Sequence, residues 1–413
     1  MSNPDSVIFH IDVNSAFLSW EALYRLEQGM DTVDLRTIPS AIGGSKESRH
    51  GIILAKSAPA RKFHVKTGEP LGSALNKCPD LVIVPPHHKE YVKRSNAFIQ
   101  LLSHYTDRLQ QVSIDEAFLD MTACLSLFGD PVAVADEIRQ TIYDSLGFTV
   151  NVGISRNKLL AKMASDFEKT NKTHTLWPEE IEKKMWPLPV SQLYFVGRSA
   201  RTKLNNLGIS TIGELAQFDL DLLMSHVGKK YGQTIHNYAN GISLEAVEEP
   251  EVQNKGIGNS VTLSHDITDM ESACQVLLSL AETVGSRLRD EHYRCFSITV
   301  EVKDWDFKRT SHQTTLPDAT DSTQTIYEVS CKLLREHWDF TPLRLLGIRA
   351  GKLSDSQYRQ MSLFDTPITE KQKKLDSAID SIRNRFGTDS IKRASFLDEQ
   401  AVTRHIQGKE NRE

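Results

Sequence analysis

Three acidic residues hold positions at which a metal ion could bind. Asp12 ends the apolar run of residues 7–13, which predicts a buried strand, and Asp115 and Glu116 lie at the turn of a hairpin predicted over residues 112–121. If the two strands are neighbours in one sheet, the three carboxylates meet, and such hard oxygen ligands suit Mg²⁺. Two ions about 3.5–4 Å apart can stabilise the attacking and the leaving oxygen of a phosphoryl transfer. The same spacing also fits a helix-capping aspartate and a solvated turn.

The elements that must position these acids alternate between strand and helix up to about residue 165. Further strands are predicted over residues 51–55, 81–84 and 148–154, and helices over residues 15–27, 88–109 and 131–146. This alternation indicates an α/β or α+β domain. We expect His10 to lie on the other face of its strand from Asp12 and to be structural.

The character of the chain changes after the first domain. Residues 166–240 are helical with Gly and Pro punctuation, and the acidic stretch 242–256 is typical of a linker. Residues 257–352 indicate a second small α+β domain, and a polar tail follows from about residue 353. In the second domain, helices are predicted over 270–291 and 323–337, and strands over 295–302 and 343–350.

Composition sets broad limits on the class of protein. The chain has 413 residues, 39% hydrophobic and 25% charged, as in a globular protein of two to four domains. A net charge of −5 argues weakly against nucleic-acid binding, but Lys and Arg outnumber Asp and Glu within residues 151–236. The five cysteines form no CxxC pair, and we find neither a signal peptide nor an 18-residue apolar run. We therefore expect no disulfide framework, no zinc site, no membrane span and a cytoplasmic location.

Four segments occur in an order that resembles the Y-family DNA polymerases, which include bacterial DNA polymerase IV. They are HIDVNSAFLSWEA (10–22), APARKFHVKTG (58–68), SIDEAFLD (113–120) and GISRNKLLAKMASDFEKT (153–170). The resemblance implies an α+β multidomain fold, with a ferredoxin-like palm, small fingers, a helix-hairpin-helix thumb and an α+β little finger. It implies a palm at 5–20 and 78–165, fingers at 21–77, a thumb at 166–241, a linker at 242–256, a little finger at 257–352 and a tail at 353–413.

The same resemblance implies an activity: error-prone, template-directed DNA synthesis on damaged templates, from deoxynucleoside triphosphates and two Mg²⁺ ions. Asp12, Asp115 and Glu116 fall on the family's catalytic, metal-binding carboxylates, and the Val13 carbonyl falls on its backbone ligand. The expected partners are primer-template DNA and nucleotides, and the chain is expected to act as a monomer.

Three further residues match the family's nucleotide site. Arg61 and Lys169 fall on triphosphate contacts, and an Arg fork and a Lys point charge both suit phosphate. Phe17 falls on the steric gate, where a bulky ring would clash with a ribose 2′-OH. Outside the motifs, the two cations would be ordinary surface residues and Phe17 a core residue of an amphipathic helix.

One departure from the family pattern concerns the triphosphate. The family commonly has Tyr where this chain has Ala58, so one phosphate contact is missing or is replaced by Lys56 or Ser57. This departure bears on nucleotide affinity and fidelity more than on the reaction.

Two regions are candidates for contact with DNA. Residues 187–215 resemble a helix-hairpin-helix with Gly197 in the hairpin, which would offer backbone N–H groups to phosphate. A plain helical hairpin is the alternative. Residues 285–309 carry six Lys and Arg residues among five acids, which fits either a strand and loop along the DNA backbone or a solvated mixed-charge face.

The polar tail holds a Leu-Phe pair within residues 360–365 (QMSLFD). Exposed apolar anchors often mark a binding site. The hexapeptide resembles the peptides that bind the bacterial sliding clamp, with Gln360 in a small polar pocket and Leu363 and Phe364 in a hydrophobic one. Alternatively, the pair docks on the chain itself. Residues 369–388 indicate a charged helix of unknown purpose.

Two other functions fit parts of this pattern. A polymerase-like chain could bridge DNA and clamp without catalysis, although all three acids are present. Another palm-fold enzyme could make or cyclise nucleotides, but this reading leaves Arg61, the helical hairpin and the clamp-like peptide unexplained. We therefore expect an active DNA polymerase.

Overall fold

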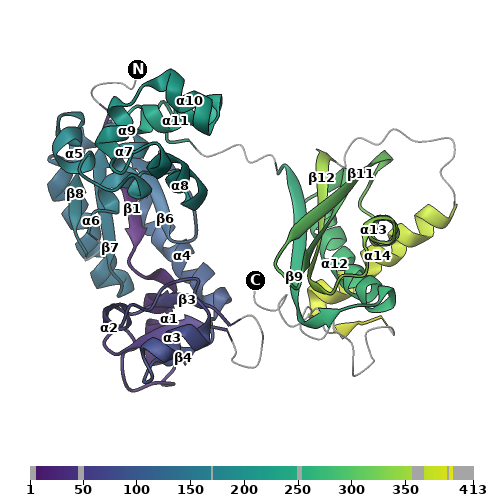
Figure 1. Ribbon diagram of the computed structural model, residues 1–413. Helices are drawn as coiled ribbons and strands as arrows, with labels where there is room; N and C mark the ends of the chain where they lie inside the picture. The colour runs from purple at the N-terminus through teal and green to yellow at the C-terminus, as the bar shows by residue number, and fades with distance from the viewer. Residues whose placement is uncertain are drawn as a thin grey trace. The chain divides into compact units, whose positions relative to one another are not determined.

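The computed structural model describes residues 6–44, 51–168, 171–248, 254–355, 367–387 and 390–393 (Figure 1). The chain divides into two units, one formed by residues 1–44 with 52–251 and the other by residues 45–51 with 252–413. Each unit has its own hydrophobic core. Within the described residues, no helix is both long and apolar enough to cross a membrane.

A five-stranded sheet lies at the centre of the first unit. Its order is β5-β6-β1-β7-β8, and the central strand β1 (Ile8–Val13) runs antiparallel to both β6 (Glu116–Asp120) and β7 (Val150–Ser155). Every residue of β1 and β7 is buried, as expected for strands covered on both faces. The edge strands are β5 (Leu109–Gln111) and β8 (Thr173–Thr175).

Alternate residues of β1 face different helices. Phe9 and Ile11 pack into a core with helices that include α4 (His88–Leu102) and α6 (Pro131–Leu146). The other face of the sheet carries α7 (Lys158–Ser165), which approaches β7 so closely that a Cβ on Gly153 would lie 2.0 Å from the Ala161 carbonyl oxygen. Glycine at this position therefore allows α7 to lie directly against the strands that carry the acids. The remaining helices of this region are α1 (Ala16–Glu27) and α5 (Leu125–Phe128).

A small three-stranded sheet forms a second layer of the first unit. Its order is β3-β2-β4, from the strands β2 (Ser40–Gly43), β3 (Ile53–Lys56) and β4 (Val82–Val84), with helices α2 (Ala58–Lys62) and α3 (Leu71–Lys77). Strand β4 pairs in parallel with β2, so residues 82–84 complete this small sheet. From the sequence, they were instead expected in the palm, within residues 78–165.

The helical stretch that follows packs around its own core, which includes residues of α7. Gly197 begins the helix α8 (Arg198–Asn206), and Gly208 takes a left-handed conformation at φ 80° before α9. Thr211 and Glu214 form a reciprocal cap at the start of α9. The helices here are η1 (Pro178–Glu180), η2 (Ile181–Met185), η3 (Val190–Gln192), α8, α9 (Ile212–Gln217), α10 (Leu220–Val227) and α11 (Lys229–Ala239).

The second unit is an antiparallel four-stranded sheet of order β11-β10-β12-β9, with α12 (Met270–Asp290) and α13 (Thr323–His337) on one face (Figure 1). The two helices and the strands β10 (Tyr293–Asp304) and β12 (Leu343–Asp355) were expected from the sequence. The strands β9 (Gly256–Ile267) and β11 (Arg309–Thr320) were not, because one face of each is polar. The expected linker therefore ends where β9 begins.

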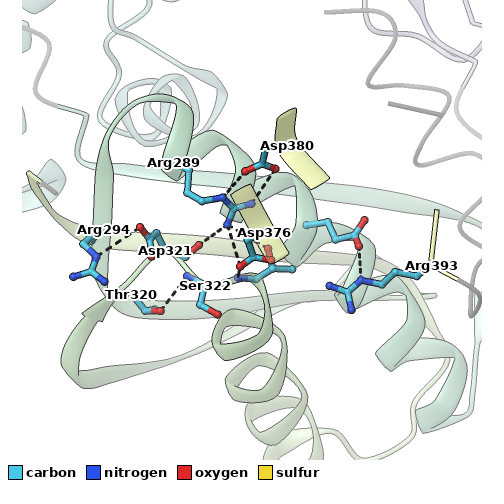
Figure 2. Close-up of polar contacts among 10 residues, drawn as sticks. Arg289, Arg294, Thr320, Asp321, Ser322, Asp376, Asp380 and Arg393 are labelled. Atoms are coloured by element: carbon cyan, nitrogen blue, oxygen red, sulfur yellow. Dashed lines mark hydrogen bonds and ion pairs between the residues drawn. The ribbon is translucent and has the colours of Figure 1, made fainter. Parts of the chain in front are cut away.

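The charged tail helix, α14 (Pro367–Phe386), docks on the second unit through buried ion pairs (Figure 2). The Arg289 guanidinium donates to Asp380 at 2.6 Å and lies 3.5 Å from Asp376. Asp376 also accepts the backbone N–H of Thr323 at 3.1 Å. Nearby, Glu282 binds two tail residues, Arg383 at 2.9 Å and Arg393 at 2.5 Å. Because charges are rarely buried unless paired, these contacts indicate that the tail is part of this unit.

Asp380→Ala should loosen α14, because it removes the stronger acceptor of a largely buried guanidinium. We expect hydrogen exchange of the α14 amides to accelerate roughly tenfold, the size of one lost charged hydrogen bond. Ser377→Ala, at an exposed position of the same helix, is the matched control and should leave exchange unchanged. Equal exchange in both variants would show that the ion pair does not hold the helix.

Candidate active site

The strand register brings the three acidic residues to one end of the central sheet. Asp12, near the end of β1, lies directly opposite Glu116 at the start of β6. Asp115 precedes Glu116 in the turn, where its carbonyl accepts the N–H of Val13 at 2.9 Å. Opposed residues of an antiparallel pair lie about 4.5–5.5 Å apart between their Cα atoms, so the carboxylates crowd together.

A lysine from α7 neutralises part of this negative charge. The Lys162 ammonium lies 2.7 Å from Glu116, 3.5 Å from Asp12 and 3.6 Å from Asp166. With the side chains in these positions, no three His, Cys, Asp or Glu residues of the described chain are grouped closely enough to hold a metal ion. The Lys162 ammonium nevertheless lies among carboxylate oxygens of the kind that bind hard metal ions. These acids therefore already balance one positive charge, and their chemistry fits a divalent cation.

The face of the strand expected for His10 was wrong, whereas its burial agrees with the structural role expected. His10 and Asp12 share a face of β1, because residues two apart in a strand point the same way. His10 Nδ1 lies 2.7 Å from the Ser165 hydroxyl of α7, and Nε2 lies 3.3 Å from Glu116. Burial lowers the pKa of His10, which favours the neutral form of the ring.

The two adjacent acids of the turn have opposite electrostatic settings. The close approach of His10, followed by that of Lys162, lowers the pKa of Glu116 to about 2. Burial, and next the charges of Asp12 and Glu116, raise the pKa of Asp115 although the Ser113 hydroxyl donates to it at 2.7 Å. Added positive charge beside Asp115 would therefore favour its ionised form.

A cleft beside the acids gathers the residues that the sequence assigned to the nucleotide. Asp12 and Asp115 line it together with Phe17 of α1 and Arg61 of α2. The backbone between Asp12 and Phe17 turns through Ser15, which adopts a left-handed conformation at φ 50°. Val13 also lines this cleft, so residues from both layers of the first unit meet there.

The two residues that could compensate for Ala58, Lys56 and Ser57, differ in whether they can reach the cleft. The Ser57 hydroxyl is buried and committed, since it donates to the Ile38 carbonyl at 2.7 Å and accepts from Ala60 N–H as the cap of α2. Lys56, in contrast, lines the cleft beside Arg61. Burial, with the Arg61 charge adding to it, lowers the Lys56 pKa, although the charge of Glu69 acts in the opposite direction. Lys56 is therefore the better replacement.

Four residues assigned from sequence lie outside the described residues: Lys169, Gln360, Leu363 and Phe364. The basic run 285–309 does not form one continuous surface. Arg289 binds the acids of α14, and Arg294 lies 3.7 Å from Asp321. Of this run, Arg309 does reach the face of the second sheet opposite α12 and α13.

The face of the second sheet opposite α12 and α13 forms, among the described residues, a polar hollow that sequence reasoning missed. Four cations line it, Lys255, Arg309, Arg349 and Lys352, together with Ser, Thr, Asn and Gln side chains and one acid, Glu301, which lies 2.5 Å from Arg309. The only signal in the sequence was the alternation of apolar and polar residues along β9 and β12. The apolar residues face α12 and α13, and the polar residues face the hollow. A concave face rich in cations and hydroxyls suits a phosphate backbone.

Comparisons with known proteins agree along most of the chain. Residues 11–166 match the impB/mucB/samB family, residues 254–363 match the C-terminal domain of that family, and residues 192–243 match the thumb domain of DNA polymerase-iota. DNA polymerase IV of Clostridium acetobutylicum is 44% identical over 394 residues, 95% of this chain and 99% of that protein. DNA polymerase IV 1 of Bacillus subtilis is 33% identical over 403 residues, 97% of this chain and 95% of that protein. A Y-family DNA polymerase chimera of known structure matches with a TM-score of 0.73 at 24% identity, covering 84% of this chain and 99% of that one.

Lys162→Gln should increase the affinity of the acids for a divalent cation, because it removes the ammonium between Asp12 and Glu116. We expect Mn²⁺ to bind roughly tenfold more tightly, as measured by electron paramagnetic resonance. Lys158→Gln is the matched control, since this α7 residue pairs with Glu245 instead. Unchanged or weaker Mn²⁺ binding in the Lys162 variant would contradict competition between the ammonium and the metal.

Proposed function

This chain belongs to the impB/mucB/samB family of Y-family DNA polymerases, and from this premise we propose how its residues carry out synthesis. It is a DNA-directed DNA polymerase that acts in translesion synthesis. The observation that carries the assignment of the site is the meeting of Asp12, Asp115, Phe17 and Arg61 in one cleft.

We propose that Asp12, Asp115, Glu116 and the Val13 carbonyl hold two Mg²⁺ ions. Support comes from the register that opposes Asp12 to Glu116, and from the Lys162 ammonium that already lies between them. When bound, such ions stabilise the attacking primer oxygen and the leaving pyrophosphate oxygen. The chain's own contribution is to fix the acids on rigid strands and to keep Glu116 ionised.

The cations of the cleft hold the triphosphate in this proposal. Arg61 offers a planar fork to two phosphate oxygens, and Lys56 supplies the point charge that offsets the absence of an aromatic hydroxyl at Ala58. Lys169 is assigned to the same role by its motif alone.

Phe17 is proposed as the sugar gate. Its ring lines the cleft next to Asp12, where a deoxyribose would lie between the acids and the template base. A 2′-hydroxyl would have to displace the ring, which disfavours ribonucleotides.

We propose two surfaces for primer-template DNA. One is the hairpin that leads into α8 at Gly197, whose N–H groups can meet phosphate. The other is the polar hollow of the second unit, with its four cations. Binding through both should weaken steeply as salt rises.

The tail peptide 360–365 is proposed to bind a sliding clamp through Gln360, Leu363 and Phe364. The support is its sequence and its place in the chain, between β12 and α14 of the second unit. We further propose that the polymerase acts as a monomer in the cytoplasm. A DNA- and clamp-binding module without catalysis is the competing function, and the first experiment below separates the two.

Asp115→Asn should abolish primer extension, because it removes a charge on which the proposed metal site depends. We expect a fall in rate of roughly a hundredfold or more, with primer-template binding retained. Extension is measured with Mg²⁺ on intact and damaged templates. Asp107→Asn, an exposed acid of the same unit, is the control and should extend normally. Full synthesis by the Asp115 variant would exclude the metal assignment, and inactivity of the unmodified chain would favour the binding module.

Leu363→Ala with Phe364→Ala should abolish stimulation by the sliding clamp, because both apolar anchors are lost. Synthesis without the clamp should stay the same, which serves as the internal control. Extension of a primed circular template with and without clamp measures both. Stimulation equal to that of the unmodified chain would refute the role of the peptide.

A further inference from the structure

A fully buried carboxylate on α1 has no part in the mechanism above. Glu21 is 0% exposed and lies four residues after Phe17 on the same helix. It accepts a hydrogen bond from the Tyr91 hydroxyl at 2.6 Å and contacts His87 Nδ1 at 2.8 Å. Arg25 lies 3.6 Å away. Burying a carboxylate is costly unless its oxygens are bonded, so this network needs a physical reason.

The hydrogen bond from Tyr91 connects Glu21 with the cleft. The Tyr91 ring is 0% exposed and packs on the Phe17 ring, with centroids 4.8 Å apart and planes inclined at 33°. The Trp20 ring packs near both, with its centroid 6.1 Å from that of Tyr91 and 6.3 Å from that of Phe17. Phe17 is only half-buried and faces the cleft with Asp12. Tyr91 therefore lies behind the ring that meets the substrate.

We propose that Glu21 is a positioning residue for sugar selection: it fixes Tyr91 by the hydroxyl, and Tyr91 stops Phe17 from moving back. This inference rests on the proposed role of Phe17 as the gate. A gate ring excludes a hydroxyl only if it cannot yield by a fraction of an ångström, and packing alone leaves an aromatic stack free to slide. A hydrogen bond to a buried carboxylate is among the stronger side-chain contacts and sets one position.

The remaining contacts of Glu21 support this purpose. His87 comes just before α4 and Tyr91 lies within it, so Glu21 ties α1 to the first turns of α4 beside Phe17. Burial, with the hydrogen bond to Glu21 adding to it, raises the pKa of Tyr91 above its usual range, which keeps the hydroxyl a donor. An apolar residue at position 21 would fill the same space without fixing the ring.

The test measures kcat/KM for a deoxynucleotide and its matching ribonucleotide on one template. The ratio of the two values cancels the fraction of active enzyme, so a change in stability alone does not move it. Tyr91→Phe keeps the ring but loses the hydroxyl, and we expect the ratio to fall roughly three- to tenfold. Glu21→Gln keeps an acceptor of weaker strength and should lower the ratio by less. Discrimination between correct and incorrect bases should stay within about twofold in both.

Two further variants make the outcome decisive. Tyr105→Phe is the matched control, because Tyr105 is a buried tyrosine of the same unit whose hydroxyl binds Glu137 at 3.3 Å, and it should leave the ratio unchanged. Phe17→Ala tests the gate itself and should abolish most of the sugar discrimination. If Phe17→Ala has no effect, the proposed gate and the inference both fail. If Phe17→Ala acts but Tyr91→Phe matches the unmodified chain, the gate stands and the role of Glu21 is overturned.

Discussion

Mutual repulsion among three carboxylates at one end of a sheet is the constraint on which the first unit depends. The register that opposes Asp12 to Glu116 creates it, and Asp115 in the adjoining turn increases it. Compensation comes from α7, which supplies the Lys162 ammonium and, through Ser165, the partner that orients His10. This helix can lie so close only because Gly153 has no side chain. The metal ions that we propose would require such concentrated negative charge, and the fold stabilises it by packing a cation against it.

Buried charge recurs in two other places, and its role differs between them. Glu21 fixes an aromatic stack behind the cleft that we propose for the nucleotide. Arg289 and Glu282 fix a tail helix on the second unit, where the result is attachment. In each case removal of one partner leaves an uncompensated charge, which costs more than the intact pair contributes. Such networks specify position better than they add stability.

The second unit shows how a binding surface can escape sequence reasoning. The sequence left the basic run at 285–309 open between a contact for DNA and a solvated mixed-charge face, and in the structure Arg289 and Arg294 pair with acids of their own unit. The cations of the open sheet face come from separate strands, among them Arg309 and Arg349. Strand pairing brings these cations together, and no local run of basic residues in the sequence predicts their grouping. In the first unit, the pairing of β4 with β2 likewise places residues 82–84 in the small sheet.

By itself the sequence determined the family and most of the elements, because its motifs and its apolar periodicity are local properties. The helices at 131–146 and 323–337 lie where periodicity predicted them. Tertiary structure alone decided which side chains meet. It placed His10 beside Glu116 and Lys162 between Asp12 and Glu116. It also placed Lys56 rather than Ser57 in the cleft, and packed Tyr91 against Phe17. These contacts join residues far apart in the chain through strand register and helix packing, which local patterns do not encode.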